Sequence, residues 1–231
     1  GFWQGYSIRP NSWLFDEIIP QMNGGVRYNY AGKFKEKWFV PQLFLQFKKQ
    51  INFFASLLLV NDEYFRGVWH KNVRRGSING NSNTSKMLSG GFYFEIGRFI
   101  ARQENIVGFG HNLSLWMTLK PLSQLVFDNS YNYSDLYRQN NAGKIFSGYI
   151  LRNKTVYQFN RNLFFRLVTQ YNSFGKNFDL DPLLSYKLNP FTIFYIGSTH
   201  DIADFGSSPM HDRFIETSRQ IFVKFQYFWR S

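Results

Sequence analysis

Cysteine is absent from this chain, and so are long apolar runs. The 231 residues include no cysteine, so no disulfide framework and no thiolate metal site can form. The longest apolar run extends from Phe53 to Val60 and is broken by Ser56. A transmembrane helix needs roughly 20 consecutive apolar residues. Any membrane span must therefore consist of strands in a closed barrel, because only closure pairs every backbone amide in lipid.

Motifs for catalysis are scarce as well. The sequence has no Gly-x-Ser-x-Gly nucleophile elbow. Its 15 acidic residues are scattered, so no pair of carboxylates suggests glycoside hydrolysis. The glycine pairs Gly24–Gly25 and Gly90–Gly91 lack the strand–loop–helix context of a phosphate-binding loop. We predict that the protein is not an enzyme and requires no cofactor.

The four histidines do not form a metal-binding motif. No two of them have the spacing of zinc ligands on a helix. One local cluster of possible ligands lies in a predicted loop and consists of His200, Asp201, Asp204, His211 and Asp212. Carboxylates of this kind can bind a divalent cation. Because polar surface loops of this composition are common, we predict a solvated loop and no metal site.

Aromatic residues, in contrast, are abundant. Phe (27), Tyr (14) and Trp (6) make up 20% of the chain, yet the mean hydropathy is −0.34. A soluble core draws mainly on Leu, Ile, Val and Ala. This composition favours a wall with one face in lipid and the other in water.

The net charge of +12 is spread along the whole sequence. Nucleic-acid-binding proteins concentrate Lys and Arg in a patch or stripe, and no such cluster is present. We therefore predict no nucleic-acid partner. On a barrel, these cations would line the lumen or face acidic lipid head groups and lipopolysaccharide.

Alternation of apolar and polar residues is clearest at the C-terminal end. One face of the last strand carries Ile221, Val223, Phe225, Tyr227 and Trp229. The other face carries Phe222, Lys224, Gln226, Phe228 and Arg230. A strand has a period of two, so one side is apolar and the other is mixed and charged. Similar segments upstream predict an antiparallel transmembrane β-barrel over residues 1–231 with about 12 strands, in the range 10–14.

The predicted connections differ in length. Short turns are expected at Lys49–Gln50, Lys120–Pro121, Asn160–Asn162 and Asn189–Pro190. Long polar loops are expected at Asn61–Lys86, Asn132–Gly143 and His200–Glu216, and an irregular segment at Asn11–Asn23. Outer-membrane barrels have short periplasmic turns and long exterior loops. A soluble β-sandwich is the alternative, and strands of ten or more residues argue against it.

Four stretches carry a family resemblance: Phe146–Arg152, Leu167–Asn172, Leu188–Asp201 and Phe222–Tyr227. They are similar to the C-terminal barrel of a bacterial outer-membrane family. Longer members of that family carry an N-terminal carbohydrate-binding-type, family-9-like β-sandwich. The family's barrel has no settled function, and the carbohydrate-related names belong to the sandwich. The resemblance therefore implies an outer-membrane barrel and no activity.

Six polar residues are expected to face the lumen of the barrel. Counting alternate positions along the strands gives Glu95, Arg152, Arg166, Gln170, Lys224 and Gln226. Such groups form either a hydrogen-bonded plug or an anion-favouring channel, and the sequence does not separate the two. At about twelve strands, the bore would be intermediate between filled small barrels and open porins.

These observations predict a location in the outer membrane of a Gram-negative bacterium. We expect a surface anchor that also forms a pore for small solutes or saccharides. The alternative is a non-enzymatic barrel subunit of a multi-protein outer-membrane complex, which docks other envelope proteins through its loops. The sequence begins at Gly1 without an initiator Met, so we expect a targeting signal, and further domains of a longer precursor, upstream.

Overall fold

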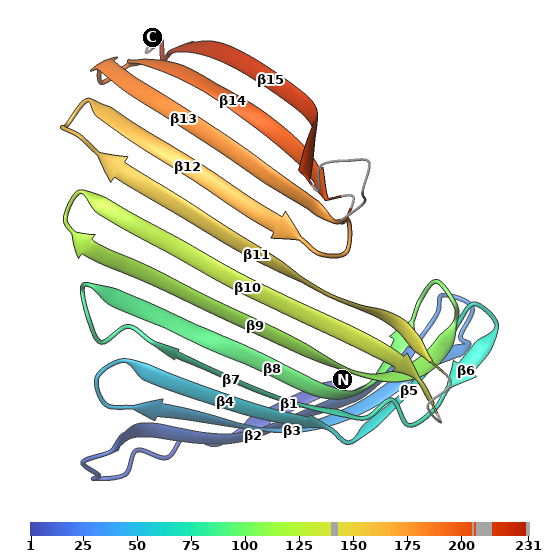
Figure 1. The fold of residues 1–231 in the computed structure, drawn as a ribbon. Helices are drawn as coiled ribbons and strands as arrows, with labels where there is room; N and C mark the ends of the chain where they lie inside the picture. The colour runs from blue at the N-terminus through green and yellow to red at the C-terminus, as the bar shows by residue number, and fades with distance from the viewer. Residues whose placement is uncertain (140–142, 205, 207–213, 230–231) are drawn as a thin grey trace. The chain divides into compact units, whose positions relative to one another are not determined.

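The computed structural model of this protein is built of β-strands (Figure 1). It describes residues 1–139, 143–204, 206 and 214–229. Within these ranges, no helix has the length and apolar character needed to cross a membrane.

The strands follow one another along the whole chain. In order they are β1 (Phe2–Gly5), β2 (Phe15–Tyr28), β3 (Phe34–Phe47), β4 (Ile51–Leu58), β5 (Val60–Phe65), β6 (Val68–His70), β7 (Arg75–Ser82), β8 (Leu88–Ala101), β9 (Ile106–Leu122), β10 (Leu125–Arg138), β11 (Lys144–Gln158), β12 (Leu163–Asn172), β13 (Asn177–Asn189), β14 (Thr192–Asp204) and β15 (Phe214–Tyr227). Most are longer than the usual five or six residues of soluble proteins.

The described strands pair in one 15-stranded sheet. The order is β1-β2-β3-β4-β7-β8-β9-β10-β11-β12-β13-β14-β15, while β5 pairs with β3 and β6. The all-β antiparallel class predicted from the sequence is therefore confirmed. The pairing order has two ends, at β1 and β15, and closure into a barrel stays a prediction.

The chain divides into two compact units. Unit 1 comprises residues 1–85, 89–115 and 132–147. Unit 2 comprises residues 86–88, 116–131 and 148–231. Strands β8 to β11 contribute residues to both.

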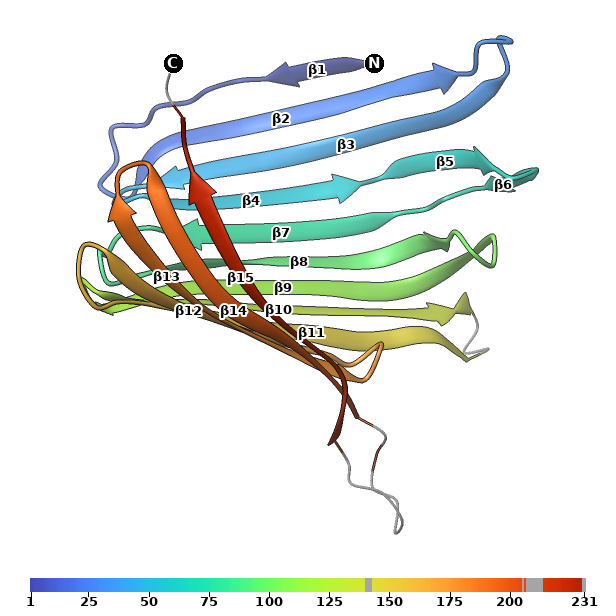
Figure 2. The ribbon, with the colours of Figure 1, turned by 90° about the horizontal axis from the view of Figure 1, so that it is seen from above.

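In unit 1, β2, β3, β4 and β7 lie side by side (Figure 2). A tight turn joins β3 to β4, with Lys49 at φ 65° and Gln50 at φ 58°. Two successive positive φ values define the hairpin turn whose twist matches that of the flanking strands. At the other end of these strands, β5 continues past β4 and pairs with β6 as a hairpin.

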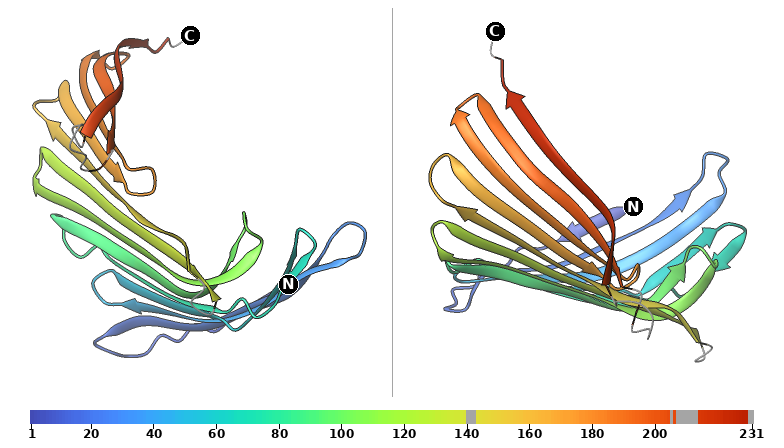
Figure 3. Two further views of the ribbon diagram at one scale, coloured as in Figure 1. Left: turned by 45° about the vertical axis from the view of Figure 1, so that its right-hand side comes forward. Right: turned by 45° about the horizontal axis from the view of Figure 1, so that its top comes forward.

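In unit 2, β12 to β15 form a meander of neighbouring hairpins (Figure 3). The turn between β13 and β14 is closed by Asn189, whose Oδ1 accepts a 2.9 Å hydrogen bond from the main-chain N–H of Phe191. The turn between β11 and β12 uses Asn160 in the same way, at 2.8 Å to the N–H of Asn162. The predicted turns at Asn160–Asn162 and Asn189–Pro190 are thus confirmed.

An apolar core is nearly absent from the described residues. Among them, the buried hydrophobic side chains are Val73, at 0% exposure, and Leu136, at 3%. Large apolar side chains along the strands are instead partly exposed. A sheet that does not bury an apolar face against another layer needs some other apolar surroundings for that face.

Two predicted irregular regions are in fact strands. The prediction of a long loop at Asn61–Lys86 is wrong, because this segment contains most of β5, all of β6 and all of β7. The Asn, Ser and Gly residues of β7 resemble a loop in sequence, but both edges of β7 are paired, with β4 and with β8. The irregular segment expected at Asn11–Asn23 is also wrong, since β2 begins at Phe15 and pairs with β3.

The other predicted loops are shorter than expected. β10 extends to Arg138 and β14 to Asp204, so most of Asn132–Gly143 and the start of His200–Glu216 are strand. Lys120–Pro121 lies within β9, and the turn falls after Leu122 instead. The marked contrast between short turns and long loops is therefore weaker than the sequence predicts.

Candidate functional site

The register of unit 2 places five of the six predicted lumen residues on one face. Directly opposed residues in antiparallel strands share a face. Arg152 is opposite Gln170, and Gln170 is opposite Asp179. Arg166 is four residues before Gln170 on the same strand, which keeps it on that face. Lys224 and Gln226 join the same face through β14, opposite Tyr195 and Ile193.

Three aspartates share this face: Asp201, which belongs to the predicted loop cluster, and Asp179 and Asp181, which no sequence motif marks. Asp179 is opposite Asp201, and Asp181 is two residues further along β13. Asp179 accepts hydrogen bonds from the amides of Gln170 at 3.2 Å and Asn177 at 2.9 Å. Like charges directly opposite each other are destabilising unless they are compensated. Asp179 and Asp181 are two positions apart, and this spacing was the sequence signal that could have placed both on one face of a strand.

Two further contacts extend the polar face of unit 2. The ammonium group of Lys154 lies 3.0 Å from the carboxylate of Asp128, which also accepts a 2.8 Å hydrogen bond from Thr118. Lys224 lies over the ring of Tyr195, 5.8 Å from its centroid. The face thus combines cations and anions and is not uniformly basic.

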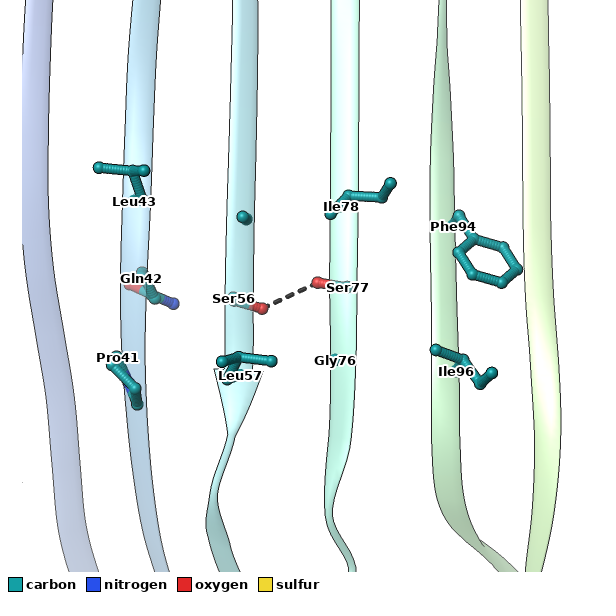
Figure 4. A pocket seen from close by; sticks show the side chains of 11 residues that line it. Pro41, Gln42, Leu43, Ser56, Leu57, Gly76, Ser77, Ile78, Phe94 and Ile96 are labelled. Atoms are coloured by element: carbon teal, nitrogen blue, oxygen red, sulfur yellow. Dashed lines mark hydrogen bonds between the residues drawn. The ribbon is translucent and has the colours of Figure 1, made fainter.

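Unit 1 has a corresponding polar face, and Glu95 lies on it. Successive registers bring one row together, which consists of Gln21, Gln42, Ser56, Ser77 and Glu95. The hydroxyl groups of Ser56 and Ser77 are 2.8 Å apart (Figure 4). Four residues before Ser56 on β4, and therefore on the same face, Asn52 donates a 3.2 Å hydrogen bond to Asn81.

A polar cavity of about 410 Å³ opens on this face of unit 1. It is lined by Glu36, Asn61, Glu63, Val73, Arg75, Glu95, Phe99, Ile100, Arg102 and Asn112. Two arginine–glutamate pairs form its walls: Arg75 with Glu95 at 2.7 Å, and Arg102 with Glu63 at 2.5 Å and 3.0 Å. Asn112 donates a 3.2 Å hydrogen bond to the second oxygen of Glu95.

Asn61 is the least satisfied polar residue of this cavity. Its side chain is buried, at 5% exposure, and its Oδ1 has no hydrogen-bond partner among the described residues. Buried acceptors without a partner are costly. The ring of Phe99 lies beneath the guanidinium of Arg75, at 5.4 Å, and gives the wall a flat apolar area. The cavity therefore presents paired charges to a small polar solute.

The opposite faces of both units carry exposed apolar side chains. In unit 1 they include Leu43, Leu57, Ile78 and Ile96, and in unit 2 Leu151, Leu184, Phe194, Ile196 and Val223. A polar network interrupts the apolar face in unit 1: Asp135 contacts Nδ1 of His111 at 2.9 Å and the hydroxyl of Tyr133 at 2.8 Å. No sequence motif marks this network.

The predicted loop cluster of histidines and aspartates is only partly described. His200, Asp201 and Asp204 lie in β14 and not in a loop. His200 contacts Ser198 at 2.9 Å and Glu216 at 2.6 Å, whereas His211 and Asp212 lie outside the described residues. Within the described part of the chain, no three His, Asp or Glu residues are arranged to hold a metal ion.

A sheet with one polar face and one exposed apolar face has the character of a wall between water and lipid. No family model matches the chain, and no curated protein matches its sequence. The fold is similar to the crystal structure of the outer membrane channel DcaP of Acinetobacter baumannii, with a TM-score of 0.54 and 9% identity. The similarity covers 91% of this chain and 80% of that one. The resemblance to the family with a carbohydrate-binding sandwich stays a prediction.

Proposed function

We propose that this chain is the wall of an outer-membrane β-barrel that lets small polar solutes cross the membrane. The proposal places the apolar face in lipid and the polar face in water. The barrel would also hold any domain fused to it at the cell surface. Neither role requires an enzymatic step or a cofactor.

One observation carries the proposal: the apolar side chains of the described strands are exposed on one face and lack a core to pack in. Ile78, Phe94 and Ile96 share that face, while Ser77 and Glu95, their neighbours along the same strands, occupy the other. In water, such a face would favour aggregation. In a bilayer it would be in its preferred solvent.

The fold similarity to DcaP supports the same reading. That protein is an outer membrane channel, and its fold is matched over most of this chain. Large β-sheets with this alternation and long strands are the material of transmembrane barrels. Closure of the sheet, through contact between its two end strands or with further chain, is part of the proposal.

The polar faces suggest which solutes could pass. The paired charges Arg75–Glu95 and Arg102–Glu63 favour small solutes with hydroxyl or amide groups. In unit 2, Asp179, Asp181 and Asp201 offset Arg152 and Arg166. We therefore propose weak ion selectivity, in place of the anion-favouring channel that the sequence left open.

Conductance in planar bilayers tests the channel. Refolded protein should produce discrete current steps in KCl, and a near-balanced lumen should give a reversal potential close to zero in a salt gradient. Folding is established independently by the mobility shift of unheated protein on a denaturing gel. Folded protein that leaves the baseline unchanged would refute the channel and leave only the anchor.

A further inference from the structure

The apolar face of unit 1 contains a groove of about 520 Å³ across β3, β4, β7 and β8 (Figure 4). Apolar side chains dominate its lining: Pro41, Leu43, Ala55, Leu57, Gly76, Ile78, Phe94 and Ile96. Two register rows account for its shape. Ala55 sits between Leu43 and Ile78, and Gly76 sits between Leu57 and Ile96. Small residues flanked by large ones account for this furrow.

Two arginines stand at one end of this groove. Arg74 is two residues before Gly76, and Arg98 is two residues after Ile96. Arg74 directly precedes β7, and the proposal takes the alternation of β7 and β8 to continue through Arg74 and Arg98, on the face of the groove. Arg75, which pairs with Glu95 on the polar face, fits this alternation. The main-chain N–H of Arg98 donates to the carbonyl of Arg74 at 2.8 Å, which holds the two residues opposite each other.

Both guanidinium groups converge on one residue. Arg74 contacts the side-chain oxygen of Asn72 at 3.4 Å, and Arg98 contacts the main-chain oxygen of Asn72 at 3.4 Å. Neither has a carboxylate partner among the described residues, and both are exposed. Asp62, which accepts a hydrogen bond from the main-chain N–H of Asn72, is already paired with Lys37 at 3.0 Å. The groove therefore ends in an uncompensated pair of positive charges.

We propose that this groove and arginine pair form a binding site for lipid A, the phosphorylated and acylated anchor of lipopolysaccharide. A phosphate would lie between Arg74 and Arg98, and one acyl chain would occupy the groove. Guanidinium groups recognise phosphate through paired hydrogen bonds, which an ammonium group cannot reproduce. The inference rests on the proposed function, because it requires the apolar face to lie in lipid.

The position of the arginines along the strands selects lipid A among anionic lipids. They lie at the end of unit 1 that carries the β5–β6 hairpin, opposite the tight turn at Lys49–Gln50. The proposal takes the end with the tight turn as periplasmic, as short turns are in outer-membrane barrels. The arginine pair would then face the outer leaflet, whose anionic lipid is lipopolysaccharide.

Native mass spectrometry of the detergent-solubilised, refolded protein tests the site. The probes are lipid A, phosphatidylethanolamine and inorganic phosphate, each added separately. We expect one lipid A to be retained, and neither of the other two to bind with comparable affinity. Each arginine near an anionic lipid contributes on the order of a five-fold change in affinity, so Arg74→Ala/Arg98→Ala should weaken lipid A binding roughly 25-fold.

Three matched variants separate charge from groove. Arg74→Lys/Arg98→Lys keeps the charge and should recover only part of the affinity. Gly76→Leu fills the furrow and should weaken lipid A binding without affecting the arginines. An added Cβ would lie 3.1 Å from the flexible end of Leu57 and 3.8 Å from the main-chain oxygen of Ser56, so folding should survive. Lys49→Ala/Arg161→Ala removes two charges from turns elsewhere and should leave binding unchanged.

The outcomes distinguish this inference from the proposed function. Equal lipid A retention by wild type and Arg74→Ala/Arg98→Ala would overturn the site, as would equal retention of phosphatidylethanolamine. If the protein still folds in bilayers and conducts, the proposed function stands in either case. Binding of inorganic phosphate as tightly as lipid A would show an anion site without a lipid, and would also overturn the inference.

Discussion

The sharpest test of the two-faced sheet compares the same substitution at two adjacent residues. Ile78 and Asn79 are neighbours in the middle of unit 1, but they lie on opposite faces of β7. Ile78 is opposite Ala55 and Phe94, on the apolar face, whereas Asn79 is opposite Phe54 and Tyr93. Ile78→Arg and Asn79→Arg therefore place the same charge one residue apart, on the face proposed to lie in lipid and on the face proposed to lie in water.

The expected difference in unfolding free energy follows from exposure. Ile78 is 38% exposed. Fully burying an isoleucine side chain is worth about 1.5–3 kcal/mol, so its outward part contributes about 0.6–1.1 kcal/mol in lipid. An arginine near the bilayer midplane costs about 2–4 kcal/mol. Ile78→Arg should therefore destabilise the protein by about 3–5 kcal/mol, and Asn79→Arg by less than about 1 kcal/mol.

The assay is guanidinium titration of protein refolded into phosphatidylcholine vesicles, monitored by tryptophan fluorescence. Refolding must be shown to be reversible at the titration end points. Equal stabilities for the two variants would refute the assignment of the apolar face to lipid. So would folding of the wild type in buffer without lipid or detergent, because that would indicate a soluble sandwich.

Three further predictions use the same titration. Gly97→Ala should destabilise the protein by more than about 3 kcal/mol, because φ at Gly97 is 148° and an added Cβ would lie 2.5 Å from Cα of Arg75. Gly32→Ala is the control: φ is 71°, nothing lies within 4 Å of the added Cβ, and the loss should be about 1 kcal/mol. Similar losses for the two variants would show that the close approach at Gly97 is unimportant. Lys49→Asn/Gln50→Gly should stabilise the protein by about 1 kcal/mol, because both positions have positive φ, and a loss would contradict the turn geometry. Glu95→Gln should destabilise the protein by about 1 kcal/mol, because it leaves Arg75 without its charged partner. In planar bilayers, the same variant should shift the reversal potential toward anion preference. An unchanged reversal potential would show that Glu95 does not line the lumen.

Strand type and face were predictable from the sequence, because both depend on local alternation. Arg152, Arg166, Gln170, Lys224 and Gln226 do share a face, since a period of two persists along each strand and the register carries it across. The regular strands of unit 2 carry aromatic and β-branched residues at every second position. That signal needs no knowledge of the neighbouring strands.

The strands missed in unit 1 could not be found in this way. β7 owes its existence to partners on both sides, because its residues Asn79, Gly80 and Asn81 have low intrinsic strand preference. The polar cavity could not be predicted from the sequence for a similar reason. Arg75 and Glu95 are 20 positions apart in sequence, and Arg102 and Glu63 are further apart still. Register across β7 and β8, not spacing along the chain, brings Arg75 and Glu95 together.

The scarcity of buried apolar residues also bears on how a chain with the proposed function would reach the outer membrane. Val73 and Leu136 alone, among the described residues, form the buried hydrophobic set, so the surrounding lipid would replace the missing interior. Because polar residues alternate with apolar ones, no segment is hydrophobic enough to be retained as a helix by the insertion machinery of the inner membrane. The alternation that creates two faces after folding would thus let the unfolded polypeptide be exported, and would postpone its hydrophobic character until the strands pair.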